Sequence, residues 1–255
     1  DAAKYRPAAC IVGVGGSATN DAGFGMARRL GWRFFGPNRQ RIESWTGLKD
    51  LEAIGRPAVP LRLGRLRVAV DVRNPLLGSR GATRIYGPQK GIRPEDVKPA
   101  EACLRRLVRV LVQQWPRYRS LASARGAGAA GGLGFGLCAF AGARLEPGFD
   151  LFSRLTGMSQ HIQSADLVVT GEGSIDQTTL AMGKGVGRVA QLARAFRRPC
   201  VGLAGMLDLT GRSAGSFTAL RAIVPGLASR EEAMAQPAYW LARLAARAAT
   251  DRRFR

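Results

Sequence analysis

Two lysines are the first residues whose type and setting suit chemistry on phosphate. The chain has 39 lysines and arginines, of which only five are lysines, so arginine is its usual surface cation. Lys90 lies in the stretch 87–91 and Lys184 in 183–185, each beside glycine. A lysine in a glycine-rich loop offers a compact point charge close to the backbone, which is a common arrangement for binding phosphate. We therefore predict that both lysines neutralise phosphate or another small anion.

A further glycine-rich segment, residues 13–21, reads Gly-Val-Gly-Gly-Ser-Ala-Thr-Asn-Asp and offers amides and hydroxyls to an anion. It follows an apolar strand expected at 8–12 and precedes a helix expected at 22–30, which is the order of a phosphate-binding turn. It matches neither the Walker pattern nor the dinucleotide fingerprint. A turn that merely joins strand to helix fits the pattern equally well. The residues predicted to bind substrate or nucleotide here are Gly15, Gly16, Ser17, Thr19, Asn20 and Asp21.

An aspartate at a strand end is the candidate for acid–base work. Residues 61–72 alternate apolar residues with arginine, which predicts a strand with outward-facing arginines and Asp71 at its end. Ligands of open α/β sheets bind at this carboxyl end of the strands, so Asp71 could meet a substrate there. Asn74 and Pro75 fix a turn directly afterwards, and an aspartate that caps this turn is an equally consistent interpretation.

Glu172 and Asp176 lie in Gly-Glu-Gly-Ser-Ile-Asp, directly after a continuous apolar strand expected at 165–170. Carboxylate oxygens are hard ligands that suit Mg²⁺, while phosphate needs backbone amides and a cation. Phosphoryl transfer requires mainly positioning and charge neutralisation, which these carboxylates and the two lysines could supply. The residues alone therefore indicate a phosphate-handling α/β enzyme.

The elements expected to position these residues alternate between helices and strands. A helix from 94 to 114 follows Lys90. A second glycine-rich turn at 125–134 leads into an apolar helix at 135–141, where small residues would also allow close helix packing. Later elements are expected as strands at 199–203 and 217–224 and helices at 186–196 and 231–250. This alternation predicts parallel strands with crossover helices, as in a doubly wound sheet.

The composition weighs against several other classes. The net charge of +21 would suit a polyanion, but arginines are spread along the whole chain and aromatics make up only 7%. A nucleic-acid-binding protein is therefore an alternative rather than the main prediction. The four cysteines form no Cys-x-x-Cys pair, and the single histidine, His161, lies in a polar segment, which together indicate reduced thiols in a cytoplasmic protein. The longest uncharged run, 126–143, contains seven glycines and is not expected to span a membrane.

Five motifs occur together and in register: Gly-Gly-Ser-Ala-Thr-Asn-Asp at 15–21, Asp-Val-Arg-Asn-Pro-Leu at 71–76, Gly-Pro-Gln-Lys-Gly at 87–91, Gly-Ala-Gly-Ala-Ala-Gly-Gly-Leu-Gly at 126–134 and Thr-Gly-Glu-Gly-Ser-Ile-Asp at 170–176. In these motifs and their order the chain resembles the bacterial glycerate kinase family, from the first strand to the C-terminal helix. The resemblance implies a kinase that uses ATP and Mg²⁺ to phosphorylate a hydroxyl of glycerate, giving 2-phosphoglycerate. It implies neither a specific nucleic-acid partner nor a membrane partner.

The resemblance also implies the fold class: α/β, with a mixed α/β domain inserted into a Rossmann-like parallel-sheet domain. Residues 1–164 would be mostly the inserted domain, and 165–255 the C-terminal part of the Rossmann-like domain. Family members usually begin with a strand and Pro-Asp-Ser-Phe-Lys-Gly and later carry Asp-Gly-Gly-Glu-Gly, and both segments would precede residue 1. A catalytically inactive remnant is therefore the alternative within the family. The oligomeric state is not predicted.

Roles for single residues follow from the same motifs. Asp71 would orient or deprotonate the attacking hydroxyl, while Lys90 and Lys184 would neutralise phosphate or the glycerate carboxylate. Glu172 and Asp176 would hold Mg²⁺. The other motif residues expected to bind substrate or nucleotide are Asn74, Gln89, Gly128, Gly131, Gly132, Gly171 and Gly173. The chain departs from the family pattern Gly-Glu-Gly-Arg-x-Asp-x-Gln-Thr-x-x-Gly-Lys at three places: Ser174 for arginine, Thr178 for glutamine, and an extra residue before Gly183.

Overall fold

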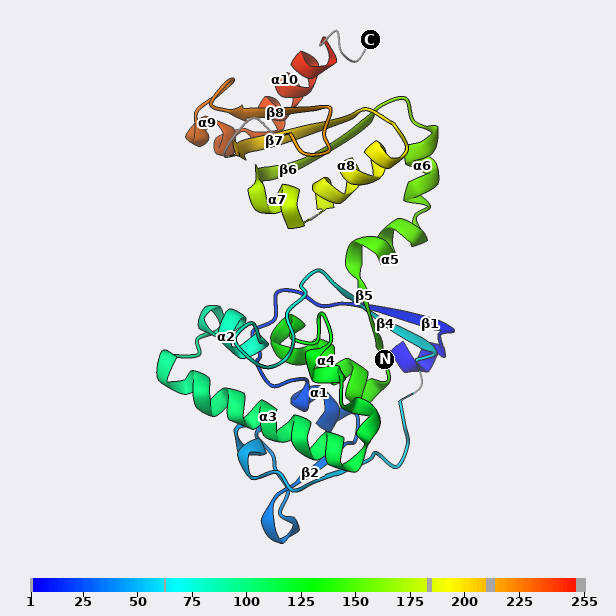
Figure 1. The fold of residues 1–255 in the computed structure, drawn as a ribbon, viewed down its shortest axis with the longest axis vertical. Coiled ribbons are helices and arrows are strands. Elements are labelled where there is room, and N and C mark those ends of the chain that lie inside the picture. Colours follow the sequence, from blue (N-terminus) through cyan, green and yellow to red (C-terminus); the bar gives the residue numbers. More distant parts are fainter. Residues whose placement is uncertain (1, 62, 183–184, 210–213, 251–255) are drawn as a thin grey trace. The chain divides into compact units, whose positions relative to one another are not determined.

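The computed structural model describes residues 2–61, 63–182, 185–209 and 214–250. The chain divides into two compact units, residues 1–148 and 149–255, and each is described by itself (Figure 1). The sequence places the division at 164/165, whereas residues 149–164 group with the second unit. The insertion of one domain into the other stays a prediction.

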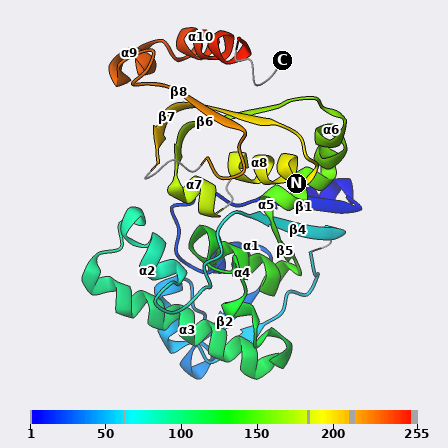
Figure 2. The same ribbon diagram turned by 45° about the horizontal axis from the view of Figure 1, so that its top comes forward.

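The first unit contains a three-stranded parallel sheet in the order β1-β4-β5. Its strands are β1 (Ala9–Gly13), β4 (Arg65–Val70) and β5 (Arg144–Pro147). Leu66, Val68 and Val70 are buried against α4 (Ala129–Ala141), which covers one face of this sheet (Figure 2). Arg65 and Arg67 of the same strand are more exposed, as predicted. Because all three strands are parallel, their carboxyl ends share one edge of the sheet.

The rest of the first unit is mostly helical. It comprises α1 (Phe24–Arg29), α2 (Ala82–Tyr86), α3 (Val97–Gln114) and the antiparallel pair β2 (Arg33–Phe35) and β3 (Ala53–Gly55). Leu104, Leu107 and Leu111 are buried on one face of α3, where their spacing places them. Short 3₁₀ segments lie at Ala2–Tyr5, Pro37–Arg39, Trp45–Asp50, Pro88–Lys90, Pro94–Asp96, Pro116–Tyr118 and Leu121–Ser123.

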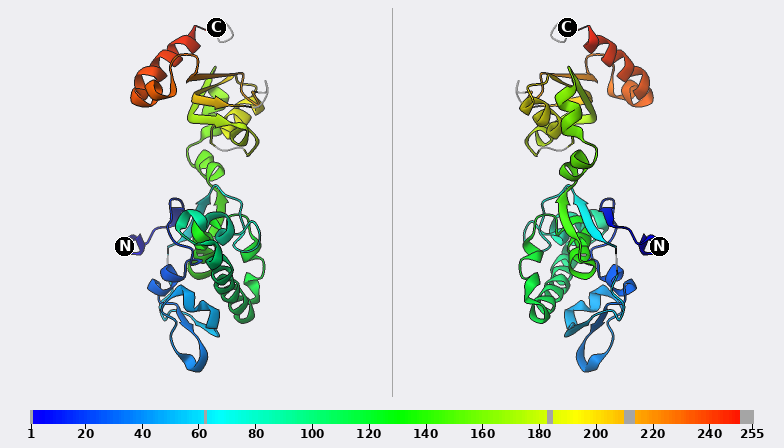
Figure 3. Two further views of the ribbon diagram at one scale, coloured as in Figure 1. Left: turned by 90° about the vertical axis from the view of Figure 1, so that its left-hand side faces the viewer. Right: turned by 90° about the vertical axis from the view of Figure 1, so that its right-hand side faces the viewer.

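The second unit contains another parallel sheet, in the order β6-β7-β8. Its strands are β6 (Val168–Asp176), β7 (Cys200–Asp208) and β8 (Ala219–Val224). The helices α8 (Gly185–Ala195) and α10 (Pro237–Ala249) lie on opposite faces of this sheet (Figure 3). Cys200 and Ala204 of β7 pack in the cluster with α8, and Val201 and Leu203 in the cluster with α10. Helices on both faces are what the alternation of elements predicts for a doubly wound sheet.

Two elements of the second unit differ from their expected bounds. The strand expected at 165–170 continues through the Gly-Glu-Gly segment to Asp176, because Gly171 leaves room for the Leu203 carbonyl oxygen, which would lie 2.6 Å from a Cβ. The closing helix expected at 231–250 is two helices, because Pro237 has no amide hydrogen and starts a new one. The remaining helices are α5 (Gly148–Leu155), α6 (Met158–Ser164), α7 (Gln177–Met182) and α9 (Arg230–Ala235).

Candidate active site

Lys90 contacts the loop that follows β1. Its Nζ donates hydrogen bonds to the Ser17 hydroxyl and, at 2.8 Å, to the Thr19 carbonyl oxygen. Burial lowers the pKa of Lys90, and the negative charge of Asp21 opposes this by raising it. Two motifs that are far apart in the sequence therefore meet, and an ammonium group, a hydroxyl and backbone groups share one place at the carboxyl edge of the sheet.

A tight turn presents Lys90 to that loop. The Lys90 amide donates to the Gly87 carbonyl oxygen at 2.9 Å, and Gly91 closes the turn with a φ of 82°, which glycine adopts without strain. Gly87 has no room for a side chain, since a Cβ there would lie 2.1 Å from the Thr83 carbonyl oxygen. Gln89, also predicted to bind substrate, is exposed on the turn. The glycines of this motif thus shape the backbone that positions the lysine.

Asn20 holds the same loop to α2. Its side chain is buried, and Nδ2 donates a hydrogen bond of 3.0 Å to the Thr83 hydroxyl, which is buried as well. Among the described residues, Asn20 Oδ1 has no hydrogen-bond partner. The structure therefore gives Asn20 a positioning role, and direct contact with a ligand stays a prediction. Thr83 was not predicted from the sequence, where only its hydroxyl, in the segment that leads to the Lys90 turn, could have indicated a role.

Asp21 stabilises the start of α1. Its two carboxylate oxygens accept hydrogen bonds from the amides of Gly23 and Gly25, at 3.0 and 2.9 Å. An acidic group beside the first amides of a helix satisfies donors that have no partner within the helix. The structure thus gives Asp21 a role at the helix start, and its predicted contact with a ligand stays a prediction.

The second glycine-rich segment packs tightly against the first. Gly131 has a φ of 65°, and a Cβ there would lie 1.9 Å from the Thr19 carbonyl oxygen. Its own carbonyl oxygen accepts a hydrogen bond from the Ala22 amide at 3.0 Å. Gly132 is also confined, because a Cβ there would collide with Leu76 and Ala22. A Cβ at Gly128 would collide with the Pro75 carbonyl oxygen. These three glycines therefore allow close packing of the backbone, and their contact with a ligand stays a prediction.

Asp71 directly follows β4, the central strand, so its place at the carboxyl edge of the sheet agrees with the sequence pattern. It is exposed, and within the described part of the chain its carboxylate makes no hydrogen bond or ion pair. Asn74 fixes the next turn instead: Nδ2 donates to the Arg80 carbonyl oxygen at 2.8 Å, and Tyr86 donates to Oδ1 at 2.6 Å. Since Asn74 holds the turn, the Asp71 carboxylate remains available to a substrate.

Gly15 and Gly16 lie in the open part of the loop after β1. Both are exposed, and a Cβ at either position would meet nothing within 4 Å. Gly16 has a φ of 61°, a conformation that glycine adopts easily. The backbone at these residues is therefore accessible to an anion, in contrast to the confined glycines of the second segment.

The predicted metal ligands of the second unit lie on one strand, β6. Glu172 is exposed and makes no hydrogen bond or ion pair in the described residues. Asp176 Oδ1 accepts hydrogen bonds from the amide and the hydroxyl of Thr179, at 2.7 and 2.9 Å, at the start of α7. Gly173 is exposed, and Gly171 allows the close pairing with β7. The two carboxylates thus have different surroundings despite their shared motif.

Glu172 and Asp176 do not fit as joint ligands of one Mg²⁺. They are four residues apart on a strand, which separates their Cα atoms by about 13 Å at the usual rise. No group of three or more His, Cys, Asp or Glu side chains in the described residues could hold a metal ion. These residues permit a Mg²⁺ ion with one carboxylate ligand, whose remaining ligands would include phosphate oxygens.

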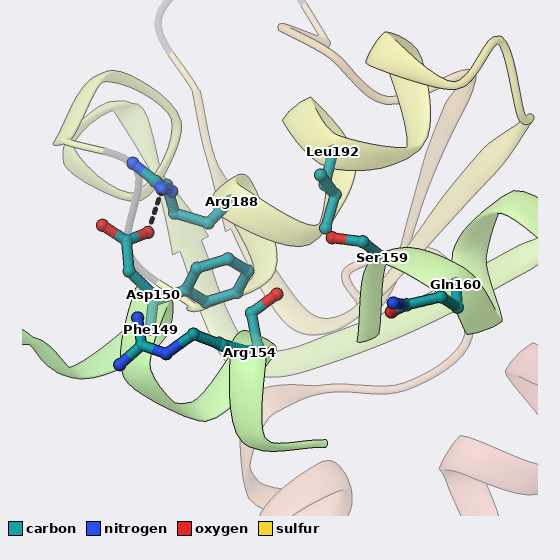
Figure 4. Close-up of a pocket in the computed structure, with 8 residues that line it drawn as sticks. Phe149, Asp150, Arg154, Ser159, Gln160, Arg188 and Leu192 are labelled. Atoms are coloured by element: carbon teal, nitrogen blue, oxygen red, sulfur yellow. Dashed lines mark hydrogen bonds and ion pairs between the residues drawn. The ribbon is translucent and has the colours of Figure 1, made fainter. Parts of the chain in front are cut away.

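Two further observations concern the second unit. Lys184, one of the predicted catalytic lysines, lies outside the described residues. A cavity of about 380 Å³ lies between α5, α6 and α8, where Arg188 forms an ion pair with Asp150 and its guanidinium lies 5.2 Å from the Phe149 ring centroid (Figure 4). None of the predicted site residues lines this cavity.

The fold and these residues first define a class: an α/β protein with parallel sheets and glycine-rich turns at the strand ends. The model of the glycerate kinase family matches residues 1–252, and the chain belongs to that family. It is 39% identical over 231 residues to a glycerate kinase of Halalkalibacterium halodurans, covering 89% of this chain and 60% of that protein. It is 38% identical over 200 residues to glycerate 2-kinase of Escherichia coli, covering 77% of this chain and 52% of that protein.

A solved structure agrees with the sequence relatives. A crystal structure assigned as glycerate kinase 2 of Salmonella typhimurium LT2 superposes with a TM-score of 0.74 at 31% identity, covering 94% of this chain and 63% of that one. The predicted family and α/β fold class are therefore confirmed. The chain spans less than two thirds of the length of each of these relatives. None of the helices in the described residues is long and apolar enough to cross a membrane.

Proposed function

We propose that the chain carries phosphoryl-transfer machinery of a glycerate kinase, which moves the γ-phosphoryl group of ATP to a hydroxyl of glycerate and gives 2-phosphoglycerate. The observation that carries the proposal is the contact of Lys90 with the Ser17–Thr19 loop at the sheet edge where the Asp71 carboxylate is available. A fixed cation and an available carboxylate at one sheet edge suit the transfer of a phosphoryl group to an alcohol.

The proposed chemistry assigns one task to each group. The Asp71 carboxylate accepts the proton of the glycerate hydroxyl as its oxygen forms a bond to the γ-phosphorus. The bond from that phosphorus to the β–γ bridging oxygen breaks, and ADP leaves with the electron pair. Lys90 neutralises a phosphate or the glycerate carboxylate, the backbone at 15–17 binds an anion, and Lys184 is proposed for the same charge-neutralising role.

ATP is the expected phosphoryl donor of a kinase, and we propose that Mg²⁺ accompanies it. Glu172 is the described carboxylate best suited to bind the ion, because it is exposed and Asp176 is engaged by Thr179. When bound, Mg²⁺ neutralises negative charge on the phosphates. Four free cysteines fit a reducing compartment, and we place the reaction in the cytoplasm on that basis.

Release of ADP from Mg-ATP by this 255-residue chain, with and without glycerate, tests the proposal. Glycerate-dependent release would establish the reaction and show that the matched region suffices. A folded sample that binds ATP without releasing ADP would instead support the alternative of a catalytically inactive chain. Tight RNA binding with a steep dependence on salt would instead support the nucleic-acid-binding alternative suggested by the charge of +21.

A further inference from the structure

A second cavity in unit 149–255, of about 530 Å³, carries several arginines and lies where β7 and β8 begin. None of the eight described residues that line it is acidic, so its charge is strongly positive. The lining residues are Arg194, Arg197, Arg198, Pro199, Gly215, Ser216, Phe217 and Thr218. No step of the proposed kinase reaction uses any of them.

The three arginines are placed by the C-terminal end of α8. The amide of Arg197 donates to the Arg194 carbonyl oxygen at 3.0 Å, and the amide of Arg198 donates to the Ala193 carbonyl oxygen at 2.8 Å. These two backbone hydrogen bonds at the end of the helix require the left-handed conformation at Arg197, which has a φ of 56°. Glycine is the usual residue at such a position. An arginine in this conformation is strained, and a function of its side chain would explain why arginine is present here instead of glycine.

The guanidinium groups keep unused hydrogen-bonding capacity. In the described residues, the side chains of Arg194 and Arg197 form no hydrogen bond or ion pair, and both are exposed. Arg198 donates from Nη2 to the Gln163 carbonyl oxygen at 2.7 Å, while its buried Nε has no partner among the described residues. An acceptor in the cavity could therefore pair with several donors at once, in the fork geometry that phosphate and carboxylate groups match.

The opposite side of the cavity offers hydroxyl groups and little aromatic surface. Ser216 and Thr218 contribute hydroxyls, and Thr218 Oγ1 already accepts a hydrogen bond from the Cys200 amide at 2.9 Å. Phe217 is the only aromatic residue that lines the cavity among the described residues, and it is 6% exposed. Single-stranded nucleic acid needs exposed aromatic faces for stacking and an extended groove. The lining therefore favours a small anion over a nucleic acid.

This cavity is also separate from the proposed catalytic end of its own sheet. The cavity lies at the amino ends of β7 and β8, whereas Asp176 ends β6 at the opposite edge. The eight steps along the nine residues from Val168 to Asp176 correspond to about 26 Å along the strand. A ligand in the cavity would therefore not be the group transferred at the β6 end.

We propose that this arginine cavity binds a small phosphate-bearing anion, such as inorganic phosphate or a phosphomonoester, at a site distinct from the kinase residues. The test is a nuclear magnetic resonance titration of the intact chain with inorganic phosphate, followed at the Ser216 and Thr218 amide signals. We expect saturable shifts at both signals. Arg194→Gln and Arg197→Asn should each weaken phosphate binding about tenfold, because each removes charge-assisted hydrogen bonds. Asparagine tolerates the left-handed backbone, so the second variant keeps the turn.

Arg230→Gln is the matched control, since Arg230 is an exposed arginine on α9 of the same unit and does not line the cavity. It should leave the titration unchanged. Phosphate that shifts neither signal, or that binds both cavity variants as tightly as the unaltered chain, would overturn the proposal. Shifts produced by a single-stranded RNA oligonucleotide but not by phosphate would also overturn it and assign the cavity to nucleic acid. Phosphate bound at the kinase residues would appear at the Ser17 and Lys90 signals instead, which keeps the two proposals distinguishable.

Discussion

The Lys90 loop of the first unit and Glu172 of the second unit differ in how firmly their side chains are held. In the first unit, Lys90 is bonded to Ser17 and Thr19, and Asn20 is bonded to Thr83. In the second unit, Glu172 is exposed on the edge strand β6 and makes no such contact in the described residues. Lys90 and Asn20 are therefore arranged before any ligand arrives, whereas Glu172 has no contact among the described residues that would order its side chain.

The sharpest contrast is between Asp71→Asn and Glu172→Gln in an active kinase. Asp71→Asn should lower kcat by about 10²–10⁴-fold with little change in ATP affinity, because only the proton acceptor is lost. Glu172→Gln should mainly raise the KM for Mg-ATP, since a proposed metal ligand is lost. Steady-state kinetics with glycerate and ATP varied in turn would separate the two effects.

Asp166→Asn is a control for both variants, because Asp166 is exposed and precedes β6 at the other edge of its sheet. It should leave both constants unchanged. If Asp71→Asn reduced turnover and nucleotide affinity equally, the assignment of Asp71 as the base would be wrong.

A second comparison concerns the glycines of the two units. Gly131→Ala should destabilise the first unit by about 4 kcal/mol, because the residue has positive φ and its Cβ would collide with the Thr19 carbonyl oxygen. Gly173→Ala in the second unit should change stability by less than about 1 kcal/mol, since a Cβ there meets nothing within 4 Å. Denaturant unfolding followed by circular dichroism measures both changes.

Equal destabilisation by the two alanine variants would contradict the contrast between a confined and an open glycine. Gly15→Ala provides a further check within the first unit, because its Cβ position is also open. It should behave like Gly173→Ala in unfolding. Any defect of Gly15→Ala in phosphate binding would then come from the loop surface and not from loss of the fold.

Local pattern was sufficient to predict much of the fold. The alternation of Leu66, Val68 and Val70 gave β4 and its outward arginines, and the heptad-like spacing of α3 gave its buried face. The extension of β6 could not be read in the same way. Two glycines disfavour a strand locally, and only pairing with β7 at Leu203 and Ala204 makes the extended backbone favourable.

The site was predictable in its residue types but not in its contacts. Glycine motifs and isolated lysines marked the loops, yet the sequence could not show that Asn20 donates a hydrogen bond to Thr83. That contact joins segments 63 residues apart, so it depends on the fold. The Asp176–Thr179 contact is local, since the two residues are three apart at the start of α7, but the expected strand end at 170 gave no reason to look for it. Spacing within a motif therefore predicted the sheet edge but not which side chains remain available there.

The smallest expected effect concerns the charge of Lys90. Burial lowers its pKa from the ordinary value of 10.5, so its ammonium group should lose its proton at lower pH than it would in water. The unfolded chain keeps the ordinary value and binds more protons between the two pKa values, so this lysine makes stability rise with pH in the window just below 10.5. Below the folded-state pKa, the cost of burying the charge is fully present.

The acetylation rate of Lys90, measured against pH by mass spectrometry, reports its pKa in the folded chain. Asp21→Asn should lower the Lys90 pKa further, because the carboxylate raises it, whereas Asp96→Asn at the start of α3 should not. A Lys90 pKa at or above the ordinary value of 10.5 would contradict its burial against the loop.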